Sequence, residues 1–499
     1  MRLGAALAGL GLLAAAPAAA QSLYPANGAV RVNPDVQLRL TFKAPPVLGS
    51  AGRIRIYDAA DGTLVDTLDL AIPAGPTKPV DPAVRAKGYI QAPYPYARTV
   101  RATNADTRPG TPSGGAVATT SDYQLTIIGG FTDGFHFYPV TIDGNTATIH
   151  PHHDLLHLGH RYIVEIDPGV LAAPGFRGVA KGRWRFATKA AGPAPDATRV
   201  TVSGSGQGDF DTVQGAMDWV PDHSPRRITV TVRNGVYEEI VYFRNKDNVT
   251  LAGESQTRTI VRYANNEVFN PHPANIRTNE RPGTFPSRRA AFAADNSNGI
   301  TIADMTIRTT APGQAEGLLI TGEHNILSRV TVIGAGDALQ ANGTLYAVDT
   351  TVEGTGDTIL GRGAAFFERC TIRSTRVMMW IRNTDANHGN VFKNCTFIGT
   401  AAEPTTIARS PENGGAAYPY AEAVLLDSTL INIAPEGWSA ADPGGRVHFW
   451  ESGSRNADGS PADTGKRAAW SRVLDPQADA KTIADYGNPA FVLGGWVPE

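Results

Sequence analysis

The N-terminal third of the chain alternates apolar and polar residues over short segments that end near Gly, Pro, Asn or Asp. Six such segments are Val36–Phe42, Arg53–Asp58, Thr63–Leu70, Tyr123–Gly129, Arg161–Ile166 and Arg183–Thr188. Because successive side chains of a strand point to opposite faces, alternation of period two predicts half-buried strands. Short strands at this spacing are typical of a β-sandwich. Residues 71–122, rich in Pro, Ala, Gly and Thr, interrupt the pattern as a long insertion.

A different pattern, a threonine between short apolar or cysteine-containing flanks, recurs in the remainder of the chain. The threonines are Thr250, Thr301, Thr331, Thr351, Thr371, Thr396 and Thr429, and the shortest gaps, from Thr331 to Thr351 and from Thr351 to Thr371, are equal. Such gaps suit one or two turns of a stacked coil with loops of varying length. An α-solenoid is the competing repeat, but β-branched residues dominate and long helical periodicity is missing. The sequence therefore predicts an all-β protein, a right-handed parallel β-helix preceded by a β-sandwich, with one helix at Thr212–Pro221 capping the β-helix.

Shifts in composition divide the chain into four parts. Residues 1–20 carry an arginine, an Ala/Leu/Gly run and small residues before Gln21, which is the layout of a cleaved signal peptide. A membrane anchor is the alternative, but the apolar run is short and no other stretch approaches about 18 apolar residues. Residues 21–190 form the sandwich, residues 191–198 a Pro/Ala/Gly linker, and residues 199–499 the β-helix. We therefore expect a secreted or periplasmic protein with no membrane span.

Charge and cysteine content narrow the possible partners. Lys and Arg number 45 against 47 Asp and Glu, and no basic run is present, so nucleic acid is not an expected partner. Cys370 and Cys395 both precede a threonine of the repeat, which predicts equivalent places on successive coils. Backbones about 4.8 Å apart allow either a disulfide or a stack of two thiols, and the sequence leaves both open.

A short segment of the predicted sandwich is rich in histidine. Its histidines are His150, His152, His153, His157 and His160. Histidine clusters can bind zinc. Because no supporting pattern of acids or cysteines accompanies them, an exposed edge or loop is the favoured interpretation.

Two aspartates match the repeat in their spacing. Asp337 and Asp357 are as far apart in the chain as Thr331 and Thr351, and each follows a glycine. Stacked strands lie about 4.8 Å apart, so the two side chains are expected side by side on one face. Two close carboxylates cannot both ionise freely, which predicts one acid with a raised pKa and one anionic nucleophile. Two solvated turn aspartates are the alternative.

Several segments, in order, resemble the motifs of the pectin methylesterase family. The first are GDFDTVQGAMDWVP (208–221), ITVTVRNGVYEEIV (228–241) and NVTLAGES (248–255). The later ones are GQAEGLLITGEHNILSRVTVIGAGDAL (313–339), VEGTGDTILGRGAAFFERCTI (352–372), TTIARSP (405–411) and DSTLINIAPEGW (427–438). The resemblance covers roughly residues 199–495 and implies a carboxylic ester hydrolase. In addition, SLYPANGAVRVNPDVQLRLTF (22–42) resembles the start of bacterial immunoglobulin-like modules.

The resemblance assigns roles to individual residues. It makes Asp357 the nucleophile on methyl esters of galacturonan, and Asp337 the acid that protonates methanol and then activates water. Arg409 would orient Asp357 and bind a substrate carboxylate, and Gln314 would stabilise the oxyanion. The alternative for Arg409 is a partner of a nearby acid, and the alternative for Gln314 is an ordinary surface residue. The further substrate-binding candidates are Gln340, Arg362 and Trp380. No cofactor and no metal are expected, and the expected partner of the monomeric chain is an anionic polysaccharide.

Departures from the family pattern keep other functions open. Gly336 stands where the family usually has a second oxyanion glutamine. After Arg409, the family has a proline and then a tryptophan, and this chain has Ser410 and Pro411. An esterase or thioesterase on another substrate, or a non-catalytic carbohydrate-binding β-helix, is therefore the alternative. We expect a glutamine at position 336 to raise activity on methylated galacturonan. NTDANHG (383–389) is similar to a polygalacturonase motif, but the other motifs of that glycosidase do not follow.

Overall fold

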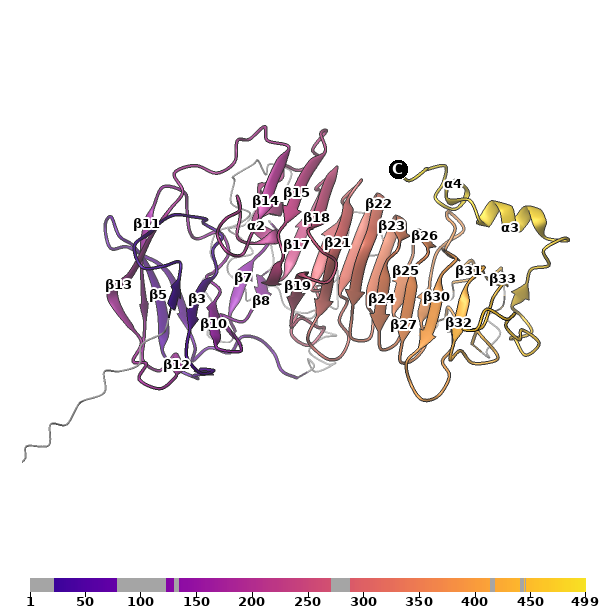
Figure 1. The fold of residues 1–499 in the computed structure, drawn as a ribbon, viewed down its shortest axis with the longest axis horizontal. Helices are drawn as coiled ribbons and strands as arrows, with labels where there is room; N and C mark the ends of the chain where they lie inside the picture. Colours follow the sequence, from indigo (N-terminus) through magenta and orange to yellow (C-terminus); the bar gives the residue numbers. More distant parts are fainter. Residues whose placement is uncertain are drawn as a thin grey trace, which may run out of the picture.

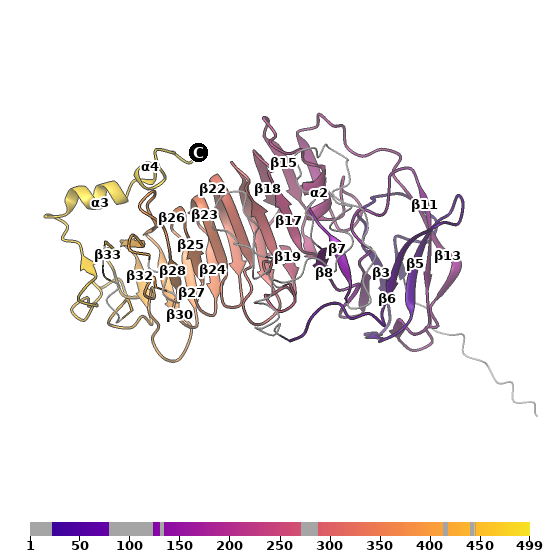
Figure 2. The ribbon, with the colours of Figure 1, turned by 180° about the vertical axis from the view of Figure 1, so that it is seen from behind.

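The computed structural model describes residues 22–78, 123–129, 134–270, 288–412, 418–439, 444 and 446–499. The predicted signal peptide and most of the predicted insertion at 71–122 lie outside these residues. Figures 1 and 2 show small sheets at one end of the molecule, a long stack of coils beside them, and two short helices at the opposite end. No helix among the described residues is long and apolar enough to cross a membrane.

The N-terminal strands form two main sheets and two short pairs. The four-stranded sheet has the order β1 (Ser22–Tyr24), β3 (Leu38–Thr41), β10 (Thr146–Ile149), β9 (Val140–Asp143). The five-stranded sheet has the order β2 (Ala29–Val32), β13 (Val179–Thr188), β11 (Arg161–Ile166), β5 (Arg53–Asp58), β6 (Leu64–Asp69). The pairs are β12 (Leu171–Ala172) with β4 (Val47–Leu48), and β7 (Leu125–Ile127) with β8 (Gly134–His136). Each of the six alternating segments contains a strand, and inward residues such as Leu38 and Trp184 are fully buried.

The remaining strands form one 21-stranded sheet wound into a parallel β-helix, which confirms the predicted architecture. Its first strands are β14 (Arg199–Val202), β15 (Ile228–Val232), β16 (Gly235–Glu238), β17 (Val241–Arg244), β18 (Val249–Gly253), β19 (Thr259–Tyr263), β20 (Phe292–Asp295) and β21 (Thr301–Thr309). Its central strands are β22 (Leu318–Ile333), β23 (Leu339–Val348), β24 (Thr351–Gly354), β25 (Ile359–Gly361), β26 (Ala364–Glu368), β27 (Thr371–Ser374) and β28 (Met379–Ile381). Its last strands are β29 (Asn390–Lys393), β30 (Thr396–Gly399), β31 (Glu422–Leu426), β32 (Thr429–Ile431), β33 (His448–Ser452) and β34 (Arg472–Val473).

The threonine repeat marks the register of the coils. From Thr331 onward, each threonine pairs with the next one on the neighbouring coil. The order of this ladder is Thr331, Thr351, Thr371, Thr396 and Thr429. Thr250 pairs with Thr301, but Thr331 pairs with Thr306 on the preceding coil. Thr301 pairs with Ile326 instead, so the ladder that starts at Thr331 continues back to Thr306 and not to Thr301.

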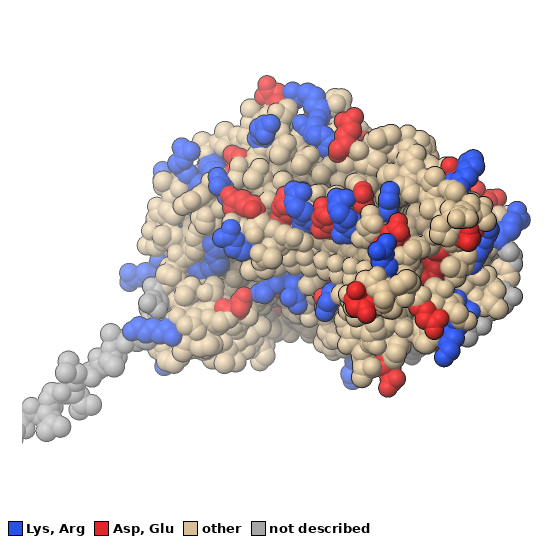
Figure 3. Space-filling view, turned by 45° about the vertical axis from the view of Figure 1, so that its right-hand side comes forward, with Lys and Arg blue, Asp and Glu red and all other residues tan. Residues whose placement is uncertain are grey.

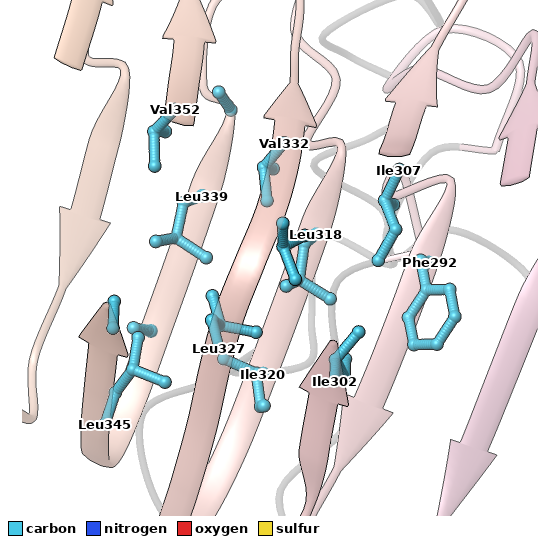
Figure 4. Close-up of a cluster of buried hydrophobic side chains, with 14 of the residues drawn as sticks. Phe292, Ile302, Ile307, Leu318, Ile320, Leu327, Val332, Leu339, Leu345 and Val352 are labelled. Atoms are coloured by element: carbon cyan, nitrogen blue, oxygen red, sulfur yellow. The ribbon is translucent and has the colours of Figure 1, made fainter. Parts of the chain in front are cut away.

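The interior of the β-helix is a continuous apolar stack. Phe292, Leu318, Leu339 and Ile359 occupy one register position on four successive coils, and none is exposed to solvent. Figure 4 shows the first three of these among other inward-pointing side chains. Burying one such side chain contributes roughly 1.5–3 kcal/mol. The ladder of apolar contacts therefore holds the coils together, which leaves outward residues free for other roles.

The predicted helix is present as α2 (Val213–Trp219), at the end of the coil stack that faces the N-terminal sheets in Figure 1. The Thr212 hydroxyl accepts a hydrogen bond from Gly215 N and so caps the helix. Both oxygens of Glu239 accept backbone N–H groups of its first turn. Asp35, from the N-terminal sheets, accepts from the N–H groups of Asp211 and Thr212. Carboxylates from both parts of the chain thus meet the positive end of one helix.

Two residues before each threonine of the ladder, a charged residue or an asparagine has a left-handed backbone conformation. These residues are Asp304, Arg329, Asp349, Arg369, Asn394 and Asp427. Neighbouring coils form ion pairs between them, Arg329 with Asp304 at 2.6 Å and Arg369 with Asp349 at 2.9 Å. Figure 3 shows basic and acidic side chains interspersed on one face of the molecule. Exposed pairs of this kind contribute about 0–1 kcal/mol each.

The structure decides between the two alternatives for the cysteines. Cys370 and Cys395 are both buried and not bonded to each other. The backbone N–H of Cys370 donates to the Cys395 sulfur at 3.3 Å. The two residues therefore form a stack of thiols inside the coil.

Two short helices, α3 (Ala480–Tyr486) and α4 (Pro489–Val492), follow the last strand of the β-helix.

The expectation of an exposed histidine loop holds for His157 and His160 and is wrong for the other three histidines. His150 and His152 are 9% and 4% exposed, and His153 is half-buried. His152 Nδ1 lies 2.7 Å from a carboxylate oxygen of Asp66, and His153 Nε2 lies 2.5 Å from one of Asp218. These acids lie 86 and 65 positions away in the chain, so the local sequence could not reveal them.

Candidate active site

Asp337 and Asp357 occupy the same place on neighbouring coils. Leu339 pairs with Ile359, and each aspartate lies two positions before its partner of that pair. The backbone N–H of Ala338, which follows Asp337, donates to Thr358 O, which follows Asp357. The spacing of the two aspartates therefore corresponds to one coil. Asp357 has a left-handed backbone, with φ 44°.

Asp337 is a buried carboxyl group held by an arginine. It is 3% exposed, and Arg289 Nη2 lies 2.5 Å from its Oδ2. Arg289 also binds the carboxylates of Glu316 and Glu267, each at 2.8 Å. Burial raises the pKa of Asp337 to about 7, Arg289 opposes this, and the charges of Glu316 and Asp357 add to it. A carboxyl group with such a pKa can serve as both acid and base near neutral pH.

Asp357 is more accessible and has a different cation. Arg409 Nη1 lies 3.0 Å from Asp357 Oδ2, which is the contact that the sequence led us to expect. The other oxygen, Oδ1, accepts no hydrogen bond among the described residues. Burial raises the pKa of Asp357, and Arg409 counteracts this by favouring the anion. Oδ1 is also buried, so the arrangement gives an arginine-bound carboxylate with one buried oxygen that has no hydrogen-bond partner among the described residues.

Gln314 is exposed and lies beside the residue that precedes Asp337. A Cβ atom added at Gly336 would lie 3.8 Å from Gln314 Cγ. Gly336 has φ 76°, and its N–H donates to Thr355 Oγ1 at 2.8 Å. A side chain other than glycine is strained at this φ. The backbone thus accounts for the glycine and weighs against our expectation that a glutamine at position 336 raises activity.

Trp380 brings two arginines together on the outer face of the coils. It follows Gln340 and Leu360 in the same outward register row. The guanidinium carbons of Arg409 and Arg382 lie 4.4 Å and 3.9 Å from the centre of its ring. Such contacts are attractive for cations over aromatic faces. An aromatic surface therefore adjoins Arg409 although no tryptophan follows it in sequence.

Arg362 lies in a neighbouring cleft of about 900 Å³, next to Asn342, whose Oδ1 accepts its backbone N–H at 3.1 Å. Arg446 and Tyr420 also line this cleft. Burial, and next the charge of Arg362, lower the pKa of Arg382 to about 10. Arg362 thus acts on Arg382, whose charge in turn acts on Asp337 and Asp357.

The sequence analysis missed two arginines of this site. Arg289 contacts Asp337 from 48 positions away, with no local motif to mark it. Arg382 is 8% exposed and acts through its charge on both Asp337 and Asp357. It immediately precedes the NTDANHG segment, whose similarity to a glycosidase motif pointed to a different chemistry. The outward register row that holds Trp380 was the signal that could have placed this segment near the aspartates.

The fold and the site place this protein in the class of parallel β-helix proteins with paired carboxylates on adjacent coils. The family model described as Pectinesterase matches residues 199–495, and the chain belongs to this family. Probable pectinesterase 30 of Arabidopsis thaliana is 28% identical over 290 residues, 54% of this chain and 55% of that protein. The pectinesterase/pectinesterase inhibitor of Ficus pumila var. awkeotsang is 27% identical over 315 residues, 59% and 55% of the two chains. The chain spans about half the length of these curated relatives.

Solved structures give similar coverage. The pectin methylesterase from carrot is 22% identical, with a TM-score of 0.49 over 61% of this chain and 95% of that chain. Pectin methylesterase PemA from Erwinia chrysanthemi is 19% identical, with a TM-score of 0.47 over 60% and 98%.

Proposed function

We propose that this chain hydrolyses the methyl esters of galacturonan and releases methanol. The observation that carries the proposal is the carboxylate pair on adjacent coils, with Asp357 bound to Arg409 and Asp337 buried at a pKa raised to about 7. Membership in the pectinesterase family gives the pair its chemical context. One anionic and one protonated carboxyl group at neutral pH are what a nucleophile and a proton donor require.

In the first half of the proposed reaction, a carboxylate oxygen of Asp357 attacks the ester carbonyl carbon. The carbonyl oxygen becomes an oxyanion, which the Gln314 amide stabilises by hydrogen bonding. The bond to the methoxy oxygen then breaks, and the carboxyl proton of Asp337 passes to that oxygen, so that methanol leaves. An acyl-enzyme on Asp357 and an ionised Asp337 remain.

In the second half, the Asp337 carboxylate takes a proton from water, and the hydroxide oxygen attacks the acyl carbon. The bond to Asp357 breaks, which restores the Asp357 carboxylate beside a protonated Asp337 and releases a galacturonic acid group, whose proton passes to solvent. Arg409 orients Asp357 and binds a uronate carboxylate. Trp380, Gln340 and Arg362 contribute to sugar binding. The chain acts as an exported monomer with its N-terminal sheets as an immunoglobulin-like module.

Methanol release from methylated galacturonan by the purified chain tests this function. A thioester and an aryl acetate run beside it, because Gly336 and the altered segment after Arg409 favour another ester substrate as the second candidate. We expect methanol release that Asp357→Ala abolishes. Turnover of only the thioester or the acetate would mean that methylated galacturonan is not the substrate, and the proposed hydrolysis by the two aspartates would still hold. Saturable binding of galacturonan without turnover of any of the three would make the chain a carbohydrate-binding protein.

A further inference from the structure

A second cluster of ionisable side chains lies between the N-terminal sheets and α2, away from the carboxylate pair. It borders a cavity of about 310 Å³ whose lining residues come from both parts of the chain. The acidic lining residues are Asp35, Asp154, Asp209, Asp218, Glu238 and Glu239. Lys189 is the one lysine or arginine among the described lining residues. An excess of carboxylates in a buried space favours a cation.

Two carboxylates converge on one imidazole nitrogen at the edge of this cavity. His153 Nε2 lies 2.5 Å from Asp218 Oδ2 and 3.6 Å from Asp154 Oδ2. The three ligand atoms all lie within 4.8 Å of one another. A ring nitrogen carries at most one proton, so its N–H donates to one of the two oxygens at a time. A single ion at this position could contact all three atoms.

Neighbouring groups hold these side chains in place. Gln214 Nε2 donates to Asp218 Oδ1 at 2.9 Å, and the same amide is fixed by the backbone N–H and carbonyl of Tyr242. His153 N donates to Thr126 Oγ1 at 2.9 Å. Ligating carboxylates and histidines in metal sites are commonly held by such outer hydrogen bonds. Asn33, 1% exposed, lines the same cavity, and its Oδ1 has no partner in the part of the chain that the structure describes.

We propose that His153 Nε2, Asp154 and Asp218 bind a divalent transition-metal ion of the Zn²⁺ type. Imidazole nitrogen with two carboxylate oxygens is a donor set that suits zinc, and water from the cavity completes four ligands. Tetrahedral ligands about 2.0–2.1 Å from zinc lie about 3.4 Å apart. The 3.6 Å separation already fits this value. The 2.5 Å separation widens by about 1 Å when zinc displaces the Nε2 proton of His153 to solvent.

The site joins two parts of the chain that are distant in sequence. His153 and Asp154 follow β10 of the N-terminal sheets, whereas Asp218 belongs to α2 at the end of the β-helix. A metal bound between them stabilises the contact of the sheets with the β-helix, because it binds the folded arrangement in preference to the unfolded chain. The site is separate from Asp337 and Asp357 and has no part in ester hydrolysis.

Calorimetric titration with Zn²⁺ tests the site, on full-length protein without a histidine tag and treated with chelator beforehand. We expect one saturable equivalent in the wild type, and an affinity at least about tenfold weaker for His153→Ala and Asp218→Asn. His160→Ala is the matched control, because His160 pairs with the single carboxylate of Asp58 at 2.7 Å and should bind zinc as the wild type does. Equal binding by all three variants, or no saturable binding by the wild type, would overturn the proposal.

Zinc X-ray absorption on the wild-type protein gives a reading that does not depend on how the variants fold. We expect one nitrogen from histidine and otherwise oxygen ligands, at about 2.0–2.2 Å. Sulfur ligands would place the ion at Cys370 and Cys395 instead, and a shell without histidine would exclude His153. Either result contradicts the proposed site.

Discussion

The two carboxylate clusters of this protein are built in opposite ways. On the coils, Asp337 and Asp357 come together through register, and each has its own arginine, Arg289 and Arg409. At the junction, Asp154 and Asp218 approach from different parts of the chain and share the single nitrogen of His153. In the first cluster, the two arginines supply the positive charge, so no metal ion is needed there and the carboxyl groups can exchange protons in the reaction. In the second cluster, two carboxylates meet one imidazole, which is the donor set of the proposed metal site.

The largest expected effect concerns the coil cluster. Asp357→Ala and Asp337→Asn should each lower the rate of ester hydrolysis by about 10³-fold or more, because no neighbour can replace a nucleophile or its acid. The apolar ladder should keep both variants folded. Asp349→Asn, a change of a turn carboxylate on the same coils, is the control. Methanol release and circular dichroism check this, and loss of ellipticity in step with activity would indicate a structural role instead.

This coil cluster is the part of the site that sequence could predict. A repeat of constant length fixes which side chains are neighbours, so Asp337 and Asp357 could be placed together before the structure was known. The same rule predicted equivalent places for Cys370 and Cys395 on successive coils, whereas α2 was predicted from the helical pattern of Thr212–Pro221. The rule could not predict Arg289, because Arg289 lies 48 positions before Asp337, more than the spacing of one coil, and no local motif marks it.

The junction was beyond sequence reasoning for a related reason. His153 and Asp218 are 65 positions apart and belong to different parts of the chain, so no period connects them. The pattern showed the histidines but not their acids. Local spacing therefore suffices where a fold repeats, and contacts between unlike regions need the three-dimensional structure.

The next effect tests the oxyanion donor. Gln314→Ala should lower turnover by about 10²–10³-fold, the usual cost of one such donor. No second glutamine stands at Gly336 to compensate. Gln256→Ala is the control, since Gln256 donates to Thr331 on the coil at 3.1 Å and lies outside the carboxylate pair. Retention of most of the wild-type rate would remove Gln314 from the proposed mechanism.

A smaller effect should follow from breaking the ion pair at the nucleophile. Arg409→Ala should cost about 10- to 100-fold in kcat/KM, the value of one hydrogen bond between charged groups. Asp357 must be ionised to attack, and Arg409 lowers its pKa. Without the arginine, the pKa of Asp357 should rise, so the acidic limb of the pH–rate profile should move to higher pH by about one unit or more.

The alkaline limb of the same profile serves as the internal reference. It depends on Asp337, which must be protonated and has a pKa raised to about 7. It should hold near that pH in the wild type and in Arg409→Ala. An acidic limb that does not move would show that Arg409 binds substrate without acting on Asp357.

Removal of metal should separate the two clusters. Chelator should leave the initial rate of the wild type at 25 °C unchanged, and lower Tm by about 2–4 °C, through loss of a ligand that binds the folded state. His153→Ala should not respond to chelator. Parallel rate assays and thermal unfolding measure this. A chelator-sensitive rate with an unchanged Tm would place the metal in the reaction and not at the junction.

The smallest effect is expected where a carboxylate is neither buried nor shared. Asp349 pairs with Arg369 at 2.9 Å on an exposed turn, where both side chains are about half exposed, at 45% and 50%. Asp349→Asn should change the free energy of unfolding by less than about 1 kcal/mol, because water screens the pair and asparagine also tolerates the left-handed backbone. Denaturant midpoints in low and high salt measure this change, which salt should erase. A loss above about 2 kcal/mol, insensitive to salt, would mean that the turn charges help to set the register of the coils, and that the apolar ladder alone does not.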